Sequence, residues 1–309
     1  MMFFAETVIS GLLTGVMYSL VALGFVLIFK ASGVFNFAQG VMALFAGLTL
    51  AGFLTGTIPI THQINSALAM PPWLAIIATV LVMIGLAILI ERLVLRYLVN
   101  QEPIILFMMT LGLAYVLEGA GDLLWGSDVK VLDLGLPSGA NDWLLDNFNL
   151  YVDQLEIVAA VVAAALVTAL AIFFQKTRIG RALRAVADDH QAAQSVGISL
   201  NTIWAIVWAA AGIVALVAGI MWGAKSGIQF SLSLIALKAL PVLILGGFDS
   251  VPGAIVGGLI IGVGEKLAEV YFGPLVGGAV ENWFAYMLAL LFLLVRPEGL
   301  FGEKIIRRV

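Results

Sequence analysis

Long apolar stretches separated by short polar ones dominate the pattern of this chain. Four of these stretches carry no charged residue at all: residues 74–90, 157–174, 203–222 and 251–263. About 20 apolar residues span the hydrocarbon core of a bilayer, and backbone groups at that depth must be hydrogen-bonded within the segment. The pattern lacks the short alternating segments of a membrane β-barrel. It predicts an all-α fold, a polytopic transmembrane helical bundle.

The bundle is expected to have about eight or nine membrane segments within a single domain covering residues 1–309. The segments at 35–56 and 230–246 are expected to be short or broken. The others are expected at residues 7–29, 73–95, 104–124, 155–174, 202–223, 252–271 and 279–295.

Composition supports the membrane assignment, since 62% of residues are hydrophobic and only 11% are charged. The 33 glycines suit close helix packing in lipid. Without cysteine, the chain can form neither a disulfide nor a thiolate metal site. The first residues, MMFFAET, carry no Lys or Arg. We therefore expect the first apolar run to be a retained span rather than a cleavable signal peptide.

The distribution of Lys and Arg predicts the orientation. With the N-terminus outside, 11 of the 15 Lys and Arg residues fall on the inner side, as the positive-inside rule favours. The C-terminus is then cytoplasmic, and an Asp-rich loop near residues 126–154 lies outside. The 11 residues are Lys30, Arg92, Arg96, Lys176, Arg178, Arg181, Arg184, Arg296, Lys304, Arg307 and Arg308.

One polar stretch, residues 175–201, interrupts the apolar pattern on the predicted cytosolic side. Its composition favours helix up to Gly197, with Gly180 as a point where it can break into two pieces. It is either a solvated connection or a docking helix that lies along the membrane and fits a partner's cleft. For docking, small and polar side chains would allow close approach and set orientation. The candidate contact residues are Arg181, Arg184, Ala185, Asp188, Asp189, His190 and Ser195.

Two polar residues, Asn36 and Gln39, lie between glycines at the start of an apolar segment. Asn36 is either the N-cap of the second span or, with Gln39, part of a polar patch facing the translocation path. A second candidate for the path is Pro241, because proline inside an apolar run suggests a discontinuous helix. Lys238 nearby either belongs to the path or snorkels to the outer interface, which is the more common behaviour.

Four carboxylates lie within predicted spans as two i, i+4 pairs, Glu118 with Asp122 and Glu265 with Glu269. We expect them near the outer ends of their spans, in structural polar contacts rather than in ion coupling. The chain holds no G-x-x-x-x-G-K-[ST] phosphate loop, so it is not itself an ATPase. No catalytic or metal-binding set of residues is expected, and neither is a nucleic-acid partner.

Four segments together resemble the branched-chain amino-acid ABC transporter permease family, of the LivH type. They occur in the family's order and extend over almost the whole chain. In place of the histidine usual in the family's first motif, this chain has Gln39. The segments are GLLTGVMYSLVALGFVLIFKASGVFNFAQG (11–40), TRIGRALRAVADDHQAAQSVGIS (177–199), KALPVLILGGFDSVPGAIVGG (238–258) and LLVRPEGLFG (293–302).

The resemblance implies a non-catalytic permease in the bacterial inner membrane that works by alternating access. It implies four kinds of partner: a second homologous permease subunit, expected to differ from this one, two cytosolic ATP-binding subunits, a periplasmic substrate-binding protein and the surrounding lipid bilayer. ATP would be bound by the partners, with no cofactor in this chain. It also implies that residues 178–196 contain the coupling helix, and that the cargo is a branched-chain or other hydrophobic amino acid.

Other functions stay open at the level of sequence. Related permeases carry urea and short amides or small carboxylates. A secondary transporter driven by an ion gradient would have to use Glu118, Asp122, Glu265 or Glu269 as coupling sites. A membrane scaffold or integral enzyme is the least favoured alternative, because no catalytic constellation is present.

Overall fold

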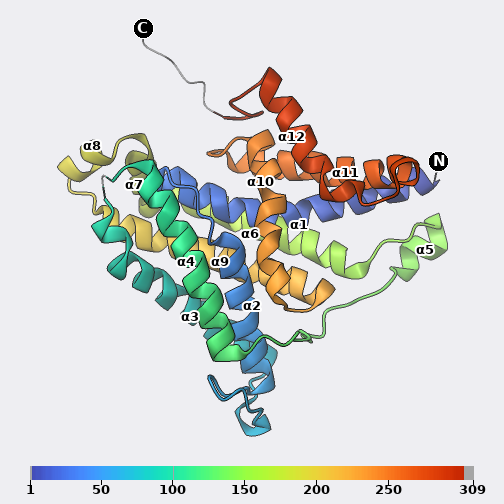
Figure 1. The fold of residues 1–309 in the computed structure, drawn as a ribbon, viewed down its shortest axis with the longest axis horizontal. Helices are drawn as coiled ribbons and strands as arrows, with labels where there is room; N and C mark the ends of the chain where they lie inside the picture. Colours follow the sequence, from blue (N-terminus) through green and yellow to red (C-terminus); the bar gives the residue numbers. More distant parts are fainter. Residues whose placement is uncertain (1, 100, 303–309) are drawn as a thin grey trace. The chain divides into compact units, whose positions relative to one another are not determined.

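The computed structural model describes residues 2–99 and 101–302, which form a succession of helices (Figure 1). Lys304, Arg307 and Arg308, counted above for orientation, lie outside the described residues. The described residues include nine apolar helices: α1 (Met2–Ser32), α2 (Gln39–Thr55), α3 (Pro72–Leu93), α4 (Pro103–Trp125), α6 (Gln154–Lys176), α9 (Leu200–Ser226), α10 (Ile235–Gly246), α11 (Val251–Val276) and α12 (Phe284–Val295). The shorter elements are η1 (Ser66–Leu68), η2 (Leu95–Tyr97), α5 (Asp142–Phe148), α7 (Arg178–Asp188), α8 (His190–Ser195), η3 (Phe230–Leu234) and η4 (Val280–Asn282).

The predicted all-α class is confirmed, since the described residues form helices and only isolated β-bridges. Six helices in this part of the chain are long and apolar enough to cross a membrane: α1, α3, α4, α6, α9 and α11. Three shorter apolar helices occur at Gln39–Thr55, Phe230–Gly246 and Phe284–Val295. Two of these were expected to be short or broken, and the second does begin as a 3₁₀ segment, η3, before α10.

Helix ends carry the expected local signals. Proline occupies the first helical position of α3 and α4, where a missing N–H costs nothing. The side chains of Ser199 and Ser250 accept backbone N–H groups at the starts of α9 and α11. Gly56 ends α2 in the left-handed conformation (φ 69°) that favours glycine.

The chain divides into two compact units. Unit 1 comprises Met1–Val26, Gly135–Ala165 and Ile235–Val309, whereas unit 2 comprises Leu27–Leu134 and Leu166–Leu234. Helices α1 and α6 contribute residues to both. In unit 1, α10, α11 and α12 pack against one another, as the orange-to-red end of Figure 1 shows. In unit 2, α2 packs against α3, α4 and α9.

In unit 1, α1 and α11 cross at very short range through small residues. A Cβ atom at Gly15 would lie 2.5 Å from the carbonyl oxygen of Gly258, and one at Gly262 would lie 2.5 Å from the backbone nitrogen of Gly15. One turn further along α1, the Ser19 hydroxyl donates to the carbonyl of Ala254 at 3.2 Å. Small residues at four-residue spacing therefore hold these two apolar helices together by backbone contact, as is common in membranes.

Also in unit 1, the segment after α12 binds the end of α10. The backbone N–H groups of Leu300 and Phe301 donate to the carbonyls of Leu245 (2.8 Å) and Gly246 (3.1 Å). Carbonyls in the last turn of a helix have no partner within that helix, so these bonds satisfy two of them. The approach requires glycine, because a Cβ at Gly299 (φ 84°) would lie 2.7 Å from the backbone nitrogen of Gly247.

We expect Gly299→Ala to lower the stability of unit 1 by about 1–3 kcal/mol, because the added methyl group meets backbone atoms that cannot easily move. A thermal unfolding curve of the purified, detergent-solubilised protein measures the effect. Gly277→Ala is the matched control, since Gly277 has a similar backbone angle (φ 90°) with nothing within 4 Å of the added Cβ. Equal losses in the two variants would show that backbone strain alone, and not the contact with Gly247, is responsible.

Unit 2 is centred on α2, whose residues from Gln39 to Gly52 are all buried. Close approach again depends on glycine, since a Cβ at Gly219 of α9 would lie 2.5 Å from the carbonyl oxygen of Ala43. The Trp125 indole at the end of α4 donates to the Thr49 hydroxyl at 3.2 Å. These contacts fix α2 against the helices that carry the polar groups considered next.

Candidate functional site

Helix α7, the first part of the predicted coupling segment, is strongly two-sided. Its buried face consists of Gly180, Leu183 and Val186, which repeat every three residues, and the helix packs against α9. The N-cap Thr177 accepts the backbone N–H of Gly180 at 3.0 Å. A helix with one apolar stripe of this kind lies on the body of the protein and presents its opposite side outward.

The corner between α6 and α7 is held by polar contacts to the end of α6. The Arg184 guanidinium donates to the carbonyl of Phe174 at 2.7 Å, where α6 is about to end. Arg is well suited to this place, because it supplies both a donor and a positive charge at a helix C-terminus. Gly180 is required there too, since a Cβ at that position would overlap the Phe174 carbonyl.

The segment does break into two helices, but at Asp189 rather than at Gly180. The Asp189 carboxylate accepts the backbone N–H groups of Gln191 (2.8 Å) and Ala192 (3.0 Å), and so starts α8 as its N-cap. Asp is among the best residues at this position, which gives the break a local cause. Gly180 instead occupies the first turn of α7, where its small size serves the contact with Phe174.

The outer side of α7 and α8 carries most of the residues predicted to contact a partner. Ala185 is partly buried, and the side chain of His190 is not described by the structure. The exposed candidates are Arg181, Arg184, Asp188, Asp189 and Ser195. The sequence-based prediction missed Val196, which follows α8 and is 74% exposed.

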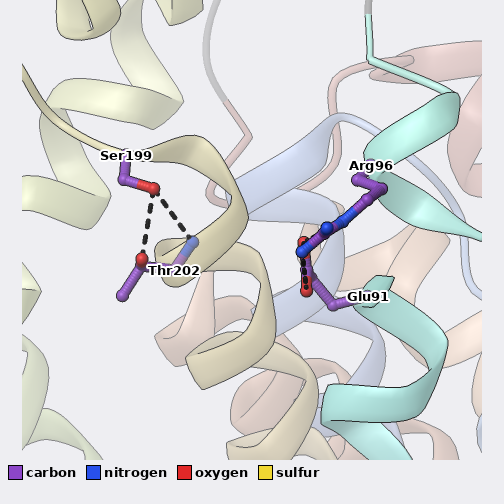
Figure 2. Close-up of polar contacts among 4 residues, drawn as sticks. All are labelled: Glu91, Arg96, Ser199 and Thr202. Atoms are coloured by element: carbon purple, nitrogen blue, oxygen red, sulfur yellow. Dashed lines mark hydrogen bonds and ion pairs between the residues drawn. The ribbon is translucent and has the colours of Figure 1, made fainter. Parts of the chain in front are cut away.

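Figure 2 shows two polar contacts in unit 2 close to this segment. Ser199, where the polar segment ends, accepts the Thr202 N–H at 3.4 Å and the Thr202 hydroxyl at 3.1 Å (Figure 2). Arg96 bonds both carboxylate oxygens of the buried Glu91 at 3.3 Å (Figure 2). The first contact is local to the start of α9 and the second joins η2 to the end of α3, and α3 and α9 pack against each other.

Asn36 and Gln39 are both buried in unit 2 and bond to each other. The Asn36 amide donates to Gln39 Oε1 at 3.4 Å, and the Gln39 amide donates to the carbonyl of Ala211 in α9 at 3.2 Å. The N-cap of α2 is Ala38 and not Asn36. Asn36 instead accepts the backbone N–H of Ala38 at 3.1 Å, an Asx turn that positions the break between α1 and α2.

A residue outside the sequence-based predictions, Thr110 of α4, holds the same break from the other side. Its hydroxyl donates to the carbonyl of Phe35 at 3.1 Å and lies 3.3 Å from the backbone nitrogen of Phe37, which donates to it. The irregular backbone between α1 and α2 is therefore satisfied by a neighbouring helix, as membrane depth requires.

Pro241 lies inside α10 and is buried. Between α10 and α11 the backbone is irregular, with Gly247 at φ 105° and Ser250 accepting the N–H of Gly253 at 3.1 Å. The discontinuous region expected from residues 230–258 therefore has two parts: η3 ahead of α10, and the turn before α11. Pro241 and Lys238 belong to unit 1, whereas Asn36 and Gln39 belong to unit 2.

Lys238, in the first turn of α10, lies close to an aromatic ring. Its ammonium nitrogen lies 5.9 Å from the ring centroid of Tyr18 in α1. The Tyr18 hydroxyl donates to Glu265 Oε2 in α11 at 2.9 Å. Tyr18 itself is near the middle of α1.

The four predicted carboxylates occupy different environments. Glu265 was expected near the outer end of its span, but α11 continues to Val276 and places it near the helix centre, 2% exposed. Glu269 accepts backbone N–H groups of Ala279 (3.1 Å) and Glu281 (3.0 Å), a structural role as expected. Glu118 and Asp122 lie in the last two turns of α4, partly buried and exposed respectively.

Comparison with known proteins gives these features a context. The model of the family described as "Branched-chain amino acid transport system / permease component" matches residues 7–296. The branched-chain permease LivH of Escherichia coli strain K12 is 29% identical over 100% of this chain and 98% of that protein. BraD of Pseudomonas aeruginosa is 28% identical over 99% and 98%, and a probable LivH of Methanocaldococcus jannaschii is 29% identical over 92% and 88%.

One solved structure, PsaBC from Streptococcus pneumoniae in complex with Fab, is similar with a TM-score of 0.49 and 14% identity, over 94% of this chain and 92% of that one. A similarity this remote carries no argument. The family match, in contrast, extends over all nine apolar helices and the α7–α8 segment. The chain belongs to the family of branched-chain amino acid transport system permease components.

Proposed function

We propose that this chain is a permease subunit of an ATP-driven importer that moves branched-chain and other hydrophobic amino acids across the bacterial inner membrane. The observation that carries the proposal is the family match over residues 7–296, which includes every apolar helix. The relatives named above are high-affinity or probable branched-chain amino acid permeases. The chain itself contributes no catalytic step.

The proposed assembly contains a second, homologous permease subunit, two cytosolic ATP-binding subunits and a periplasmic substrate-binding protein. ATP binds to the partners only, because this chain has no phosphate loop. The N-terminus lies outside and the C-terminus lies in the cytoplasm, which puts α7 and α8 on the side of the ATPases.

The α7–α8 segment is the proposed mechanical link to the ATPases. Its apolar stripe is fixed on α9, and Arg184 ties it to the end of α6, so that a push on the segment is transmitted to two membrane helices. The exposed Arg181, Asp188 and Val196 supply charge and an apolar contact for the partner. Asn36, Gln39 and the broken region at Pro241 remain our proposed positions for the path.

The test is uptake of radiolabelled leucine by cells that lack the gene, with and without a plasmid copy. We expect uptake to depend on the gene and to persist after an uncoupler dissipates the ion gradient, provided that ATP is maintained. Uptake lost to the uncoupler at constant ATP would indicate an ion-coupled carrier. Gene-dependent uptake of urea or a small carboxylate, with none of leucine, would replace the cargo assignment.

A further inference from the structure

Unit 1 contains a group of polar side chains embedded in apolar helices, which we call the midspan cluster. Its members are Thr14 and Tyr18 of α1, Lys238 of α10 and Glu265 of α11. Tyr18 and Glu265 are each near the middle of a helix long enough to span the bilayer. Ionisable residues at such depth are costly and usually serve a function.

Tyr18 connects the two charged members of the midspan cluster. Its hydroxyl donates to Glu265 Oε2 at 2.9 Å, while the Lys238 ammonium lies 5.9 Å from its ring centroid, within the range of a cation–π contact. A positive group therefore lies over the ring of Tyr18, and a negative group accepts its hydroxyl. Within the described residues, Lys238 and Glu265 form no ion pair with each other.

Two further polar atoms of the midspan cluster have no hydrogen-bond partner among the described residues. They are Glu265 Oε1 and Thr14 Oγ1, and their residues are 2% and 4% exposed. Thr14 lies one turn before Tyr18 on the same face of α1, the turn over which a helical tyrosine side chain extends. A buried polar atom without a partner costs free energy, so a purely structural cluster would be expected to close on itself.

Lys238 is only partly buried and lies in α10, which contains Pro241 and is preceded by the 3₁₀ segment η3. Broken helices at mid-membrane depth are common where transporters bind their cargo. The midspan cluster thus combines a partly buried cation, a buried carboxylate oxygen and a buried hydroxyl.

We propose that the midspan cluster binds the charged head of a zwitterionic α-amino acid during its passage. Lys238 forms an ion pair with the α-carboxylate. Glu265 Oε1 and the Thr14 hydroxyl oxygen accept hydrogen bonds from the α-ammonium group. Tyr18 is a positioning residue that holds Glu265 through its hydroxyl. The inference rests on the proposed amino-acid cargo and assigns the residues that recognise the part shared by all such substrates.

The test uses the complete importer, with its binding protein, reconstituted in proteoliposomes that contain ATP. We expect Glu265→Gln and Lys238→Met each to lower the initial rate of [¹⁴C]leucine uptake at least about tenfold, because each variant leaves one charge of the substrate unpaired. Lys266→Met is the matched control. Lys266 is adjacent to Glu265 but pairs with Glu281 at 3.4 Å, and its loss should leave uptake within about twofold.

A second readout does not depend on variants. Photo-leucine, which keeps the zwitterionic head, is irradiated with the wild-type importer during turnover, and labelled peptides are identified by mass spectrometry. We expect label on peptides containing Tyr18, Lys238 or Glu265, and competition by unlabelled leucine.

Three results would overturn the inference: normal uptake by Glu265→Gln and Lys238→Met, losses of uptake matched by loss of thermal stability of the complex, or label confined to other helices. In all three cases the wild-type importer still takes up leucine, so the proposed function stands. Failure of the wild-type importer to take up leucine would instead refute the proposed function itself.

Discussion

Asp188→Arg is expected to reduce ATP-dependent uptake at least about tenfold while the protein still inserts and folds. Asp188 is exposed at the end of α7, beside other exposed residues of the proposed contact surface. Reversal of its charge would break an ion pair with the docked partner or place two like charges together. Either change weakens binding of the partner by several kcal/mol. A cation at a helix C-terminus is favourable, so α7 itself should not lose stability.

The measurements are leucine uptake, the amount of protein in the membrane and co-purification of the ATP-binding subunits. Asp146→Arg is the matched control, because Asp146 is also an exposed helical aspartate, in α5, on the side we propose to be periplasmic. The docking assignment predicts full uptake for Asp146→Arg. If Asp188→Arg keeps both uptake and its ATP-binding partners, α7 is not the contact.

Gly15→Val is expected to prevent accumulation of folded protein. Its added Cβ would meet the carbonyl oxygen and Cα atoms of α11, which can yield only if the two helices separate. Overpacking in a tight core usually costs 1–3 kcal/mol, and about that much or more is expected where backbone meets backbone. Fluorescence-detected size-exclusion chromatography of detergent extracts measures the surviving folded fraction.

Gly85→Val is the control for the helix itself. Gly85 is an exposed helical glycine of α3 with nothing within 4 Å of an added Cβ. We expect normal amounts of folded protein from this variant. A similar loss in both variants would mean that valine is harmful in these helices generally, and that the α1–α11 crossing is not the cause.

Most of the fold could be predicted from the sequence, because apolar length decides where helices cross a membrane. All nine expected segments appear, with ends displaced by a few residues where caps such as Ser199 and Ser250 determine the start. The break in the coupling segment was misplaced, since glycine is the stronger breaker in general. Here Gly180 does not break the helix, and its lack of a side chain allows the close contact with Phe174. The break comes at Asp189, which is the N-cap of α8.

The candidate site was predictable only in part. The exposed face of α7 follows from helical periodicity, so most of its members could be identified from sequence. The midspan cluster could not be, because Tyr18 and Glu265 are far apart in the chain and meet only through the packing of α1 on α11. The true length of α11 also had to be known before Glu265 could be placed near its centre.

The contact between the segment after α12 and the end of α10 bears on how the protein is made. Leu300 and Phe301 leave the ribosome long after Leu245 and Gly246, whose carbonyls they satisfy. The last carbonyls of α10 therefore lack these hydrogen-bond partners during synthesis, until α11, α12 and the segment after α12 have also been made.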